Sequence, residues 1–267
     1  MSRILLTYFF CLITIFSYSE NIKDSIDFNY DYGYIIIKAE INKKEYSFLF
    51  DTGARTSITK KVINDLKLLK ISSKPFDKYK VSILITSCIK KDNFNVKTTD
   101  FPLKKIINGG IIGYDFFKNL IFSIDYNKRK IYFLERIDSL KNGIKFNVNF
   151  YTNPNGIIKL NDKIINVVFD TGYSSGSGIS LAISKENLKV INIDTLKVNT
   201  LEYHSELYGI IKQKEYFIGK INIPNSISED KIEIQKKFNL NLLGNTFFEK
   251  YLTTFDFVNN YIYLTMK

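Results

Sequence analysis

The chain has 267 residues and a formal net charge of +11 at pH 7, and 45% of its residues are hydrophobic. This apolar content suffices for a buried core and excludes a chain that is disordered throughout, and the length fits one large all-β domain or two smaller lobes. The positive charges are spread along the chain and form no basic run or basic helix. This favours a solvated lysine-rich surface over a surface that binds nucleic acid.

Residues 1–19 are predicted to be a secretory signal peptide. Arg3 supplies a short positive region, residues 4–16 are almost entirely apolar, and residues 17–19 place serines where a signal peptidase reads small side chains. The apolar stretch is shorter than the about 20 residues that a membrane span needs. We therefore expect an exported protein, periplasmic or extracellular, with no stable membrane insertion after cleavage. An uncleaved anchor, a buried strand and lipidation of Cys11 are the alternatives.

Cysteine and histidine are too scarce for several common kinds of site. Cleavage of the signal leaves Cys88 as the only cysteine, so no intramolecular disulfide is expected. A catalytic thiol needs a histidine partner, and His204 is the only histidine in the chain, which disfavours a cysteine peptidase. No cofactor and no metal ion are expected.

Alternating, β-branched and aromatic residues predict strands along the first half, at residues 34–41, 45–50, 80–85, 121–126 and 130–134. Helical spacing is found at residues 60–69 and, more weakly, at residues 114–120. The second half repeats this order, because residues 156–160 and 164–169 match the first hairpin, with a turn at residues 161–163. The fold is therefore expected to be all-β with few short helices.

The two halves also align directly, which indicates an internal duplication. Residues 116–126 align with residues 247–257 at an offset of 131, and residues 131–134 align with residues 262–265. The polar, turn-rich stretch around residues 139–143 is a natural boundary. We predict an N-terminal lobe at residues 20–140 and a C-terminal lobe at residues 141–267. The recurring Asp125 and Asp256 are interpreted as structural turn residues.

The tripeptide Asp-Thr-Gly occurs twice, each time at the end of an apolar run. The two copies begin 119 residues apart, at Asp51 and at Asp170. Each copy is followed downstream by two aliphatic residues and a glycine, which are Ile111-Ile112-Gly113 and Leu242-Leu243-Gly244. Two carboxylates in matching settings suggest two half-sites of one acid/base pair.

The chemistry of such a pair follows from burial and proximity. An apolar strand delivers each aspartate to a buried position, where loss of solvation raises its pKa. The glycine permits a tight turn that brings backbone N–H groups to the carboxylate. Two carboxyl groups that face each other cannot both ionise readily, so the pair holds one proton. The ionised member can take a proton from a bound water and the protonated member can donate one to a carbonyl oxygen, which is general acid/base hydrolysis.

These motifs resemble the aspartic peptidase superfamily, and most closely its bacterial retropepsin-like group of exported single-chain proteins with two fused lobes. The resemblance spans nearly all of the mature chain. It implies two homologous closed β-barrel lobes of the pepsin/retropepsin type, with a cleft between them that binds an extended peptide. It assigns Asp51 and Asp170 as the catalytic pair. It also assigns supporting residues in matching pairs: Thr52 and Thr171 for a hydrogen-bonded grip between the lobes, Gly53 and Gly172 for the turns, Gly113 and Gly244 for the strand-to-helix turns behind them.

Three features of the chain depart from the family pattern or are harder to place. Tyr173 follows the second motif, where a smaller residue is usual, and its ring either crowds the pair or packs outward. A hairpin over residues 203–218 is a candidate flap that would bring Tyr203 and Tyr208 to the substrate, although both can also be plain surface residues. Residues 79–88 are the equivalent candidate in the first lobe.

The sequence therefore predicts an exported aspartic endopeptidase that hydrolyses peptide bonds with water activated between Asp51 and Asp170. Its partner is a peptide or protein substrate and not nucleic acid, and a monomer is expected because the duplication supplies both half-sites. The alternatives are a catalytically inactive peptide-binding module with the same fold, and a surface-interaction protein that binds anionic lipid or polysaccharide.

Overall fold

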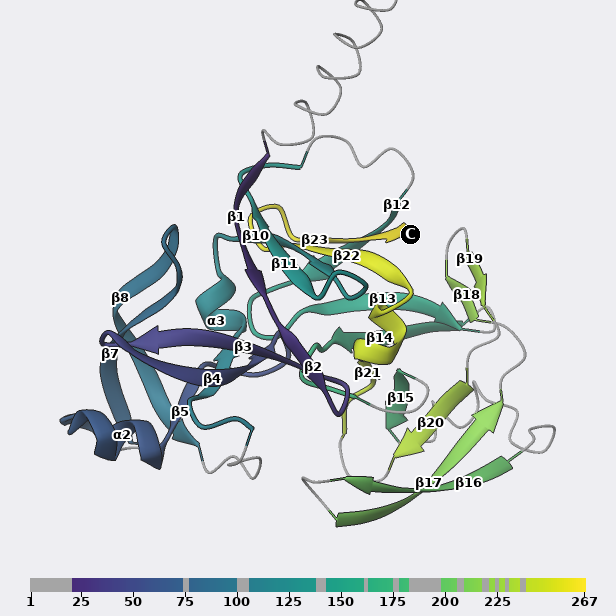
Figure 1. Cartoon of the computed structure of the whole chain (residues 1–267). Coiled ribbons are helices and arrows are strands. Elements are labelled where there is room, and N and C mark those ends of the chain that lie inside the picture. Colours follow the sequence, from purple (N-terminus) through teal and green to yellow (C-terminus); the bar gives the residue numbers. More distant parts are fainter. Residues whose placement is uncertain are drawn as a thin grey trace, which may run out of the picture.

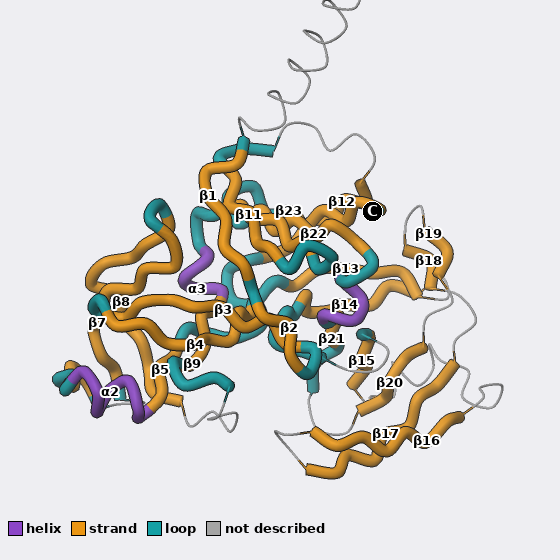
Figure 2. Tube along the Cα trace, viewed as in Figure 1, coloured by secondary structure: helices purple, strands orange, loops and turns teal. Residues whose placement is uncertain are grey.

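The computed structural model describes residues 21–73, 77–99, 106–137, 143–160, 163–174, 178–182, 198–205, 209–217, 221–223, 226–228, 231–235 and 239–267. These residues fold almost entirely into strands, which confirms the predicted all-β class (Figures 1 and 2). The predicted signal peptide at residues 1–19 and the predicted lobe boundary at residues 140 and 141 lie outside the described residues.

The first half of the chain supplies one long series of strands with two short helices. Its elements are β1 (Ile22–Asp27), β2 (Asn29–Asp31), β3 (Tyr34–Ile41), β4 (Lys44–Asp51), β5 (Ser57–Thr59), α2 (Lys60–Leu66), β6 (Lys70–Ser72), β7 (Lys78–Thr86), β8 (Ile89–Thr99), β9 (Gly110–Gly113), α3 (Tyr114–Phe117), β10 (Ile121–Asp125) and β11 (Lys130–Leu134).

The second half follows the same plan. Its elements are β12 (Gly143–Asn149), β13 (Asn155–Leu160), β14 (Lys163–Phe169), β15 (Ile179–Ala182), β16 (Val198–Ser205), β17 (Gly209–Phe217), β18 (Ile221–Ile223), β19 (Ser226–Ser228), β20 (Lys231–Gln235), β21 (Leu242–Leu243), α5 (Asn245–Phe248), β22 (Tyr251–Asp256) and β23 (Tyr261–Met266).

A closed barrel forms in the first half. Strands β3, β4, β9, β5, β8 and β7 are hydrogen-bonded in that order, and β7 pairs back onto β3, where Ile83 lies opposite Ile41. The side chains of β7 alternate between exposed and buried along most of its length, as expected when one face of a strand lines a core. The barrel interior is closed by large apolar side chains such as Phe48 and Ile37, which are 0% and 1% exposed.

A second sheet joins the two halves of the chain. Its first six strands in order are β1, β11, β10, β22, β23 and β12, so strands of the first half lie beside strands of the second half (Figure 1). The contact between β10 and β22 is antiparallel and places Phe122 opposite Phe255, whose rings stack at 5.2 Å. The two halves thus share one hydrophobic core along this sheet.

The duplication appears in the structure as a pseudo-twofold axis. At the sequence offset of 131, Ser123 is equivalent to Thr254, and these two residues lie directly opposite each other in β10 and β22. Their hydroxyl groups share a hydrogen bond of 2.7 Å. A residue that pairs with its own equivalent must lie on the symmetry axis, so the axis passes between Ser123 and Thr254.

The second half repeats the strand pairing around the second motif. β14 runs parallel to β21 as β4 runs parallel to β9, and β15 runs antiparallel to β21 as β5 does to β9. The sheet that joins the two halves continues beyond β12 through β13, β14, β21, β15, β20, β17 and β16. It contains 13 of the described strands. A second closed barrel stays a prediction.

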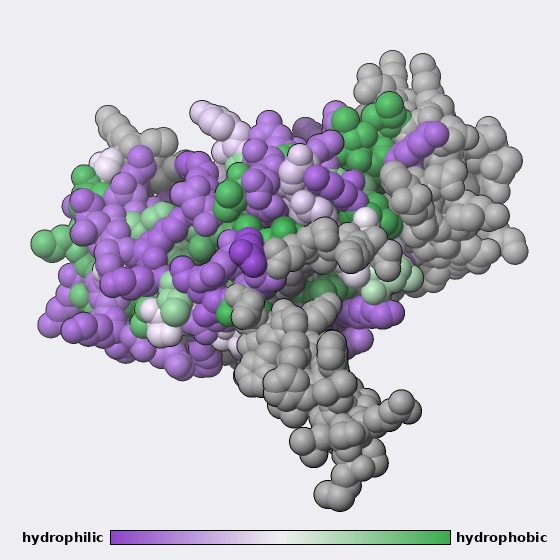
Figure 3. All heavy atoms as spheres, turned by 90° about the horizontal axis from the view of Figure 1, so that it is seen from above, coloured by the Kyte–Doolittle hydropathy of each residue, from purple (hydrophilic) through white to green (hydrophobic). Residues whose placement is uncertain are grey.

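On the face that Figure 3 shows, the described surface is mainly hydrophilic, with smaller hydrophobic areas between the polar ones. Cys88 is a free and exposed cysteine on the turn between β7 and β8. In the part of the chain that the structure describes, no helix combines the length and the apolar character that a membrane crossing requires.

Candidate active site

Each Asp-Thr-Gly motif begins where a buried strand ends. The last six residues of β4 are buried, and Asp51 closes this strand opposite Gly113 of the parallel strand β9. In the second half, Phe169 ends β14 and lies opposite Leu243 of β21, and the next N–H group, that of Asp170, donates to the Leu243 carbonyl at 2.8 Å. Since each aspartate is fixed by strand pairing in a core, its position does not depend on a long free loop.

The two loops are held together by their threonines. The Thr52 N–H donates to the Thr171 hydroxyl at 3.0 Å, and the Thr171 N–H donates to the Thr52 hydroxyl at 3.0 Å. Each hydroxyl then donates across to the other half, from Thr52 to the Phe169 carbonyl at 2.7 Å and from Thr171 to the Phe50 carbonyl at 2.9 Å. Both threonines are 0% exposed, so four buried and symmetric hydrogen bonds fasten the loops.

The carboxyl groups of Asp51 and Asp170 face each other across this contact. A methyl group placed on Gly53 would lie 2.4 Å from Asp170 Cγ, and one on Gly172 would lie 2.2 Å from Asp51 Cγ. Each carboxyl group therefore packs on the glycine of the other motif, where no other residue fits. Asp51 is 8% exposed, whereas Asp170 is partly exposed. The structure thus brings the two predicted residues together with one open side.

Backbone donors orient each carboxylate. Asp51 Oδ1 accepts from the N–H groups of Gly53 at 2.8 Å and Ala54 at 2.9 Å, and Asp170 Oδ1 accepts from the N–H of Gly172 at 2.8 Å. These donors come from the tight turns that the glycines permit. They leave the outer oxygens of the pair for a ligand or for each other.

The surroundings raise the pKa of both carboxyl groups. Burial raises the pKa of Asp51 well above its usual value, the charge of Asp170 and a hydrogen bond to it add to the rise, and the N–H donors oppose it. Burial also raises the pKa of Asp170, while the Gly172 N–H and the hydrogen bond from Asp51 oppose this rise. Because both values are raised and the two groups interact, the pair holds one shared proton over a range of pH. The pair can therefore supply an acid and a base at the same pH.

The two downstream glycines lie directly behind the loops. A methyl group on Gly113 would lie 2.1 Å from the Ala54 carbonyl oxygen, and one on Gly244 would lie 2.4 Å from the Tyr173 carbonyl oxygen. The methyl group on Gly244 would also lie 2.7 Å from Tyr173 Cδ1, so the Tyr173 ring packs beside this glycine. The nearest atoms around Gly53 and Gly172 are carboxylate atoms, so the ring does not separate the pair.

Residues that follow these glycines support the loops, and their roles were not predicted from the sequence. Asp115 Oδ1 accepts from both the N–H of Thr56 at 2.8 Å and the hydroxyl of Thr56 at 2.7 Å. In the second half, the Asn245 side chain donates to the Thr171 carbonyl at 2.7 Å and accepts from the Tyr126 hydroxyl at 2.7 Å. The only available signal was that polar residues follow two aliphatic residues and a glycine in both repeats.

Of the two predicted substrate contacts, Tyr203 lies in the described part of the chain. Tyr203 lies in β16, which pairs with β17 as a hairpin, and Ile211 is opposite it, whereas Tyr208 lies outside the described residues. The predicted first-lobe flap at residues 79–88 forms a hairpin, but its turn contacts β1: the Cys88 N–H donates to Asp24 Oδ2 at 3.3 Å. This turn therefore lies against the sheet that joins the two halves, of which β1 is an edge strand.

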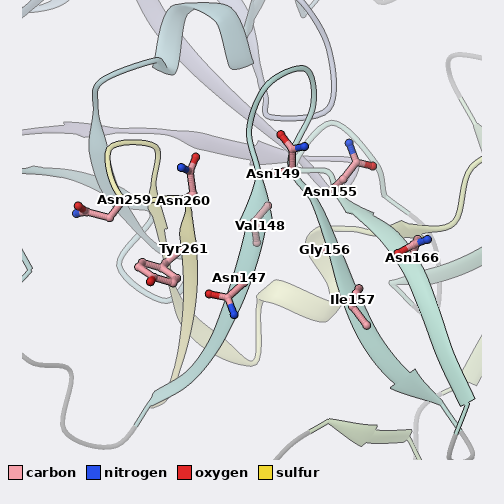
Figure 4. A pocket seen from close by; sticks show the side chains of 10 residues that line it. All are labelled: Asn147, Val148, Asn149, Asn155, Gly156, Ile157, Asn166, Asn259, Asn260 and Tyr261. Carbon is pink, nitrogen blue, oxygen red and sulfur yellow. The ribbon is translucent and has the colours of Figure 1, made fainter.

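A hollow outside this site lies between β12, β13, β14 and the turn before β23 (Figure 4). It has a volume of about 510 Å³ and is lined mainly by asparagines. Several of these amides are used in their own turns: Asn149 accepts from the Tyr151 N–H, and Asn259 donates to Asp256. We therefore read the hollow as a by-product of turn geometry. It contains neither Asp51 nor Asp170.

The two recurring aspartates outside the pair are turn residues. Asp125 Oδ1 accepts from the N–H groups of Asn127 and Lys128, and Asp256 Oδ1 accepts from those of Val258 and Asn259. This arrangement caps the turns that follow β10 and β22. Symmetric recurrence alone therefore does not mark a functional carboxylate in this chain, whereas contact across the axis separates Asp51 and Asp170 from the rest.

Comparison with known proteins finds no matching family model and no matching curated protein. Function is therefore inferred from the geometry of the two loops.

Proposed function

We propose that this protein is an aspartic-type endopeptidase that hydrolyses peptide bonds in an extended substrate. The observation that carries the proposal is the contact between the Asp51 and Asp170 carboxyl groups, each packed on the glycine of the other motif. Two buried carboxyl groups that share a proton have little structural value, because burying a charge is costly and no ion pair within the described residues neutralises either group. Such an arrangement is expected where catalysis needs an acid and a base together.

In the proposed reaction, a water molecule bound between the carboxyl groups attacks the carbonyl carbon of the scissile bond. Ionised Asp170 removes a proton from this water while protonated Asp51 donates its proton to the carbonyl oxygen, which gives a neutral tetrahedral diol. The protonated Asp170 then donates to the leaving nitrogen, Asp51 takes back the hydroxyl proton, and the C–N bond breaks. One water is consumed, and no covalent intermediate with the protein forms.

The repeated strand pairing supports the aspartic peptidase type of fold as part of this proposal. Each motif ends a strand that is parallel to a short strand with two aliphatic residues, and each of these leads into a one-turn helix, α3 or α5. The matching order of the second half makes a second closed barrel the natural completion. The cleft would then lie between the barrels over the carboxyl pair.

The remaining expectations belong to the same proposal. The chain is proposed to act outside the cytoplasm, as a monomer, on a peptide or protein, without nucleic acid, cofactor or metal. Tyr203 and Tyr208 are proposed to contact substrate from the β16–β17 hairpin. Both half-sites come from one chain and meet on its internal axis, which supports a monomeric active unit.

The test is cleavage of unfolded proteins and a peptide library between pH 3 and pH 7 by the wild type and by Asp51→Asn and Asp170→Asn. Each substitution removes one ionisable group of the pair, so each is expected to abolish cleavage while the fold is kept. Asp125→Asn is the matched control, since Asp125 occupies a recurring position but only caps a turn, and it should cleave normally. Reaction in ¹⁸O-labelled water should place one label in each new carboxyl group.

Two results would count against the peptidase. Cleavage that survives in either Asp→Asn variant would exclude a shared-proton mechanism. A peptide that binds in a manner sensitive to both aspartates but is recovered intact at every pH would instead identify a catalytically inactive binding module.

A further inference from the structure

Asn245 makes an unusual set of contacts for the first residue of a one-turn helix. Its side chain is 0% exposed, and it joins three groups from different parts of the chain. Oδ1 accepts from the Tyr126 hydroxyl at 2.7 Å, and Nδ2 donates to the carbonyls of Thr171 at 2.7 Å and Gly33 at 2.8 Å. Since carbonyl oxygens can only accept, the two carbonyls fix which end of the amide is the NH₂ group.

One of these contacts is a single peptide group away from a carboxylate of the pair. The Thr171 carbonyl and the Gly172 N–H belong to the same planar peptide unit. Asn245 binds the carbonyl end of this unit, and the N–H end donates to Asp170 Oδ1 at 2.8 Å. The Asn245 side chain therefore sets the tilt of the donor that binds Asp170. A hydrogen bond to a carbonyl also polarises the peptide and strengthens its N–H as a donor.

The first half-site is held by different hydrogen bonds. Tyr114 occupies the position equivalent to Asn245, and the next residue, Asp115, holds Thr56 through two hydrogen bonds. All three residues belong to the first lobe. The second loop, in contrast, is held by a residue whose own partners, Tyr126 and Gly33, come from the first half of the chain. The second half-site thus depends on contacts between the halves.

Tyr126 is itself firmly placed. It is 7% exposed, and its ring makes edge-to-face contacts with Phe28 at 6.0 Å and Tyr30 at 5.5 Å. Burial raises the pKa of Tyr126 well above its usual value, so its hydroxyl stays protonated and donates to Asn245 at any working pH. The Tyr30 hydroxyl donates to Glu249 and takes no part in the contacts of Asn245.

We propose that Asn245 is a positioning residue for Asp170, which clamps the Thr171–Gly172 peptide group against the Asp170 carboxylate and is held in place by Tyr126. This inference rests on the proposed function insofar as it concerns turnover. The amide touches neither substrate nor the carboxylate, so it acts through the peptide group alone.

The sign of the effect follows from the direction of the hydrogen bond. The Gly172 N–H stabilises the ionised form of Asp170, so a looser peptide group raises the pKa of Asp170. The ionisable group that contacts Asp170 directly is Asp51, and those around Asn245 are Tyr126 and, behind it, Tyr30, Glu249 and Lys267. Replacing either neutral tyrosine by phenylalanine changes no charge near Asp170.

The experiment compares Tyr126→Phe with Tyr30→Phe in the full chain. Both remove one tyrosine hydroxyl from the same aromatic cluster, but only the first removes a partner of Asn245. Tyr126→Phe should move the acidic limb of the pH–rate profile upward by about 0.3–0.5 pH unit. It should also lower kcat roughly threefold to tenfold with little change in KM. Tyr30→Phe should leave the profile and kcat unchanged. Asn245→Ala should exceed Tyr126→Phe in both effects.

A readout that needs no turnover separates this inference from the peptidase proposal. In protein with ¹³C-labelled aspartate, the carboxyl titration of Asp170 should shift upward in Tyr126→Phe and not in Tyr30→Phe. A shifted titration in a protein that cleaves no peptide would support the clamp and remove the peptidase. Normal cleavage with an unmoved titration, or equal effects of the two Tyr→Phe variants, would overturn the clamp and leave the peptidase intact.

Discussion

The four hydrogen bonds that Thr52 and Thr171 make between the two halves allow a stringent test of the fold and the site together. Thr52→Val replaces a hydroxyl by a methyl group of similar volume, so it removes hydrogen bonds with little change in packing. It deletes the bond that Thr52 donates to the Phe169 carbonyl and the bond that it accepts from the Thr171 N–H. Thr171→Val deletes the two symmetric bonds, which involve the Phe50 carbonyl and the Thr52 N–H.

Each substitution leaves one backbone N–H and one carbonyl without a partner in a fully buried position. A buried polar group that loses its partner costs about 1–3 kcal/mol, so with two such groups each variant should lose about 2–6 kcal/mol of the free energy of unfolding. A domain has only about 5–15 kcal/mol in total, so this loss is large. The pseudo-twofold symmetry further predicts that the two losses agree within about 1 kcal/mol.

Urea unfolding measures these free energies. The chain contains 18 tyrosines and no tryptophan, so far-UV circular dichroism and tyrosine fluorescence are the suitable signals. Thr52→Ser keeps the hydroxyl and should retain most of the stability. Ser123→Ala combined with Thr254→Val is a second control on the same axis: it removes both members of one hydroxyl pair and should cost less than about 1 kcal/mol. A loss below about 1 kcal/mol in Thr52→Val, or strongly unequal losses in the two Thr→Val variants, would refute the interlocked arrangement.

Two further outcomes follow from the carboxyl pair. Gly53→Ala places a methyl group 2.4 Å from Asp170 Cγ, so the pair must move apart by about 1 Å, and cleavage should fall roughly 100-fold; cleavage at the wild-type rate would contradict the facing arrangement. Burial raises the pKa of both Asp51 and Asp170, so above about pH 4 these two carboxyl groups bind more protons in the folded than in the unfolded chain. The stability contributed by these carboxyl groups is complete below that pH and is lost as the pH rises through the raised values. Asp51→Asn should therefore melt at a higher temperature than the wild type at pH 7, and this advantage should vanish near pH 3; calorimetry that finds a difference independent of pH would contradict the raised pKa values.

Sequence patterns predicted elements well where burial alternates along a single strand. The predicted strand at residues 130–134 coincides with β11, whose side chains alternate between buried and half-buried. The predicted strand at residues 34–41 also coincides with β3, whose apolar run Ile35-Ile36-Ile37 is buried on both faces. The helix predicted at residues 60–69 ends earlier. The backbone of Lys67 turns to a φ of 48°, and α2 stops at Leu66. Side-chain spacing contains no information about that local reversal.

Contacts that depend on distant parts of the chain could not be predicted in the same way. β8 is rich in lysine and asparagine and gave no strand signal, yet it forms because β7 and β5 supply its backbone partners on both sides. The contact of Asn245 with Tyr126 joins residues on α5 and after β10, and no local pattern links them. The same holds for the turn at Cys88, whose partner Asp24 lies 64 residues earlier.

A duplicated chain explains why some of these long-range partners could be predicted and others could not. A residue on the pseudo-twofold axis faces its own copy, so the repeat itself names the partner: Thr52 meets Thr171, and Ser123 meets Thr254. A residue away from the axis faces a different environment in each half, and its two copies are free to diverge. This is why one loop is held by Asp115 within its own half, and the other by Asn245, which is itself bound to Tyr126 and Gly33 of the first half. Chemistry that requires two like groups in contact is therefore confined to the axis, and the residues that tune each group differ between the halves.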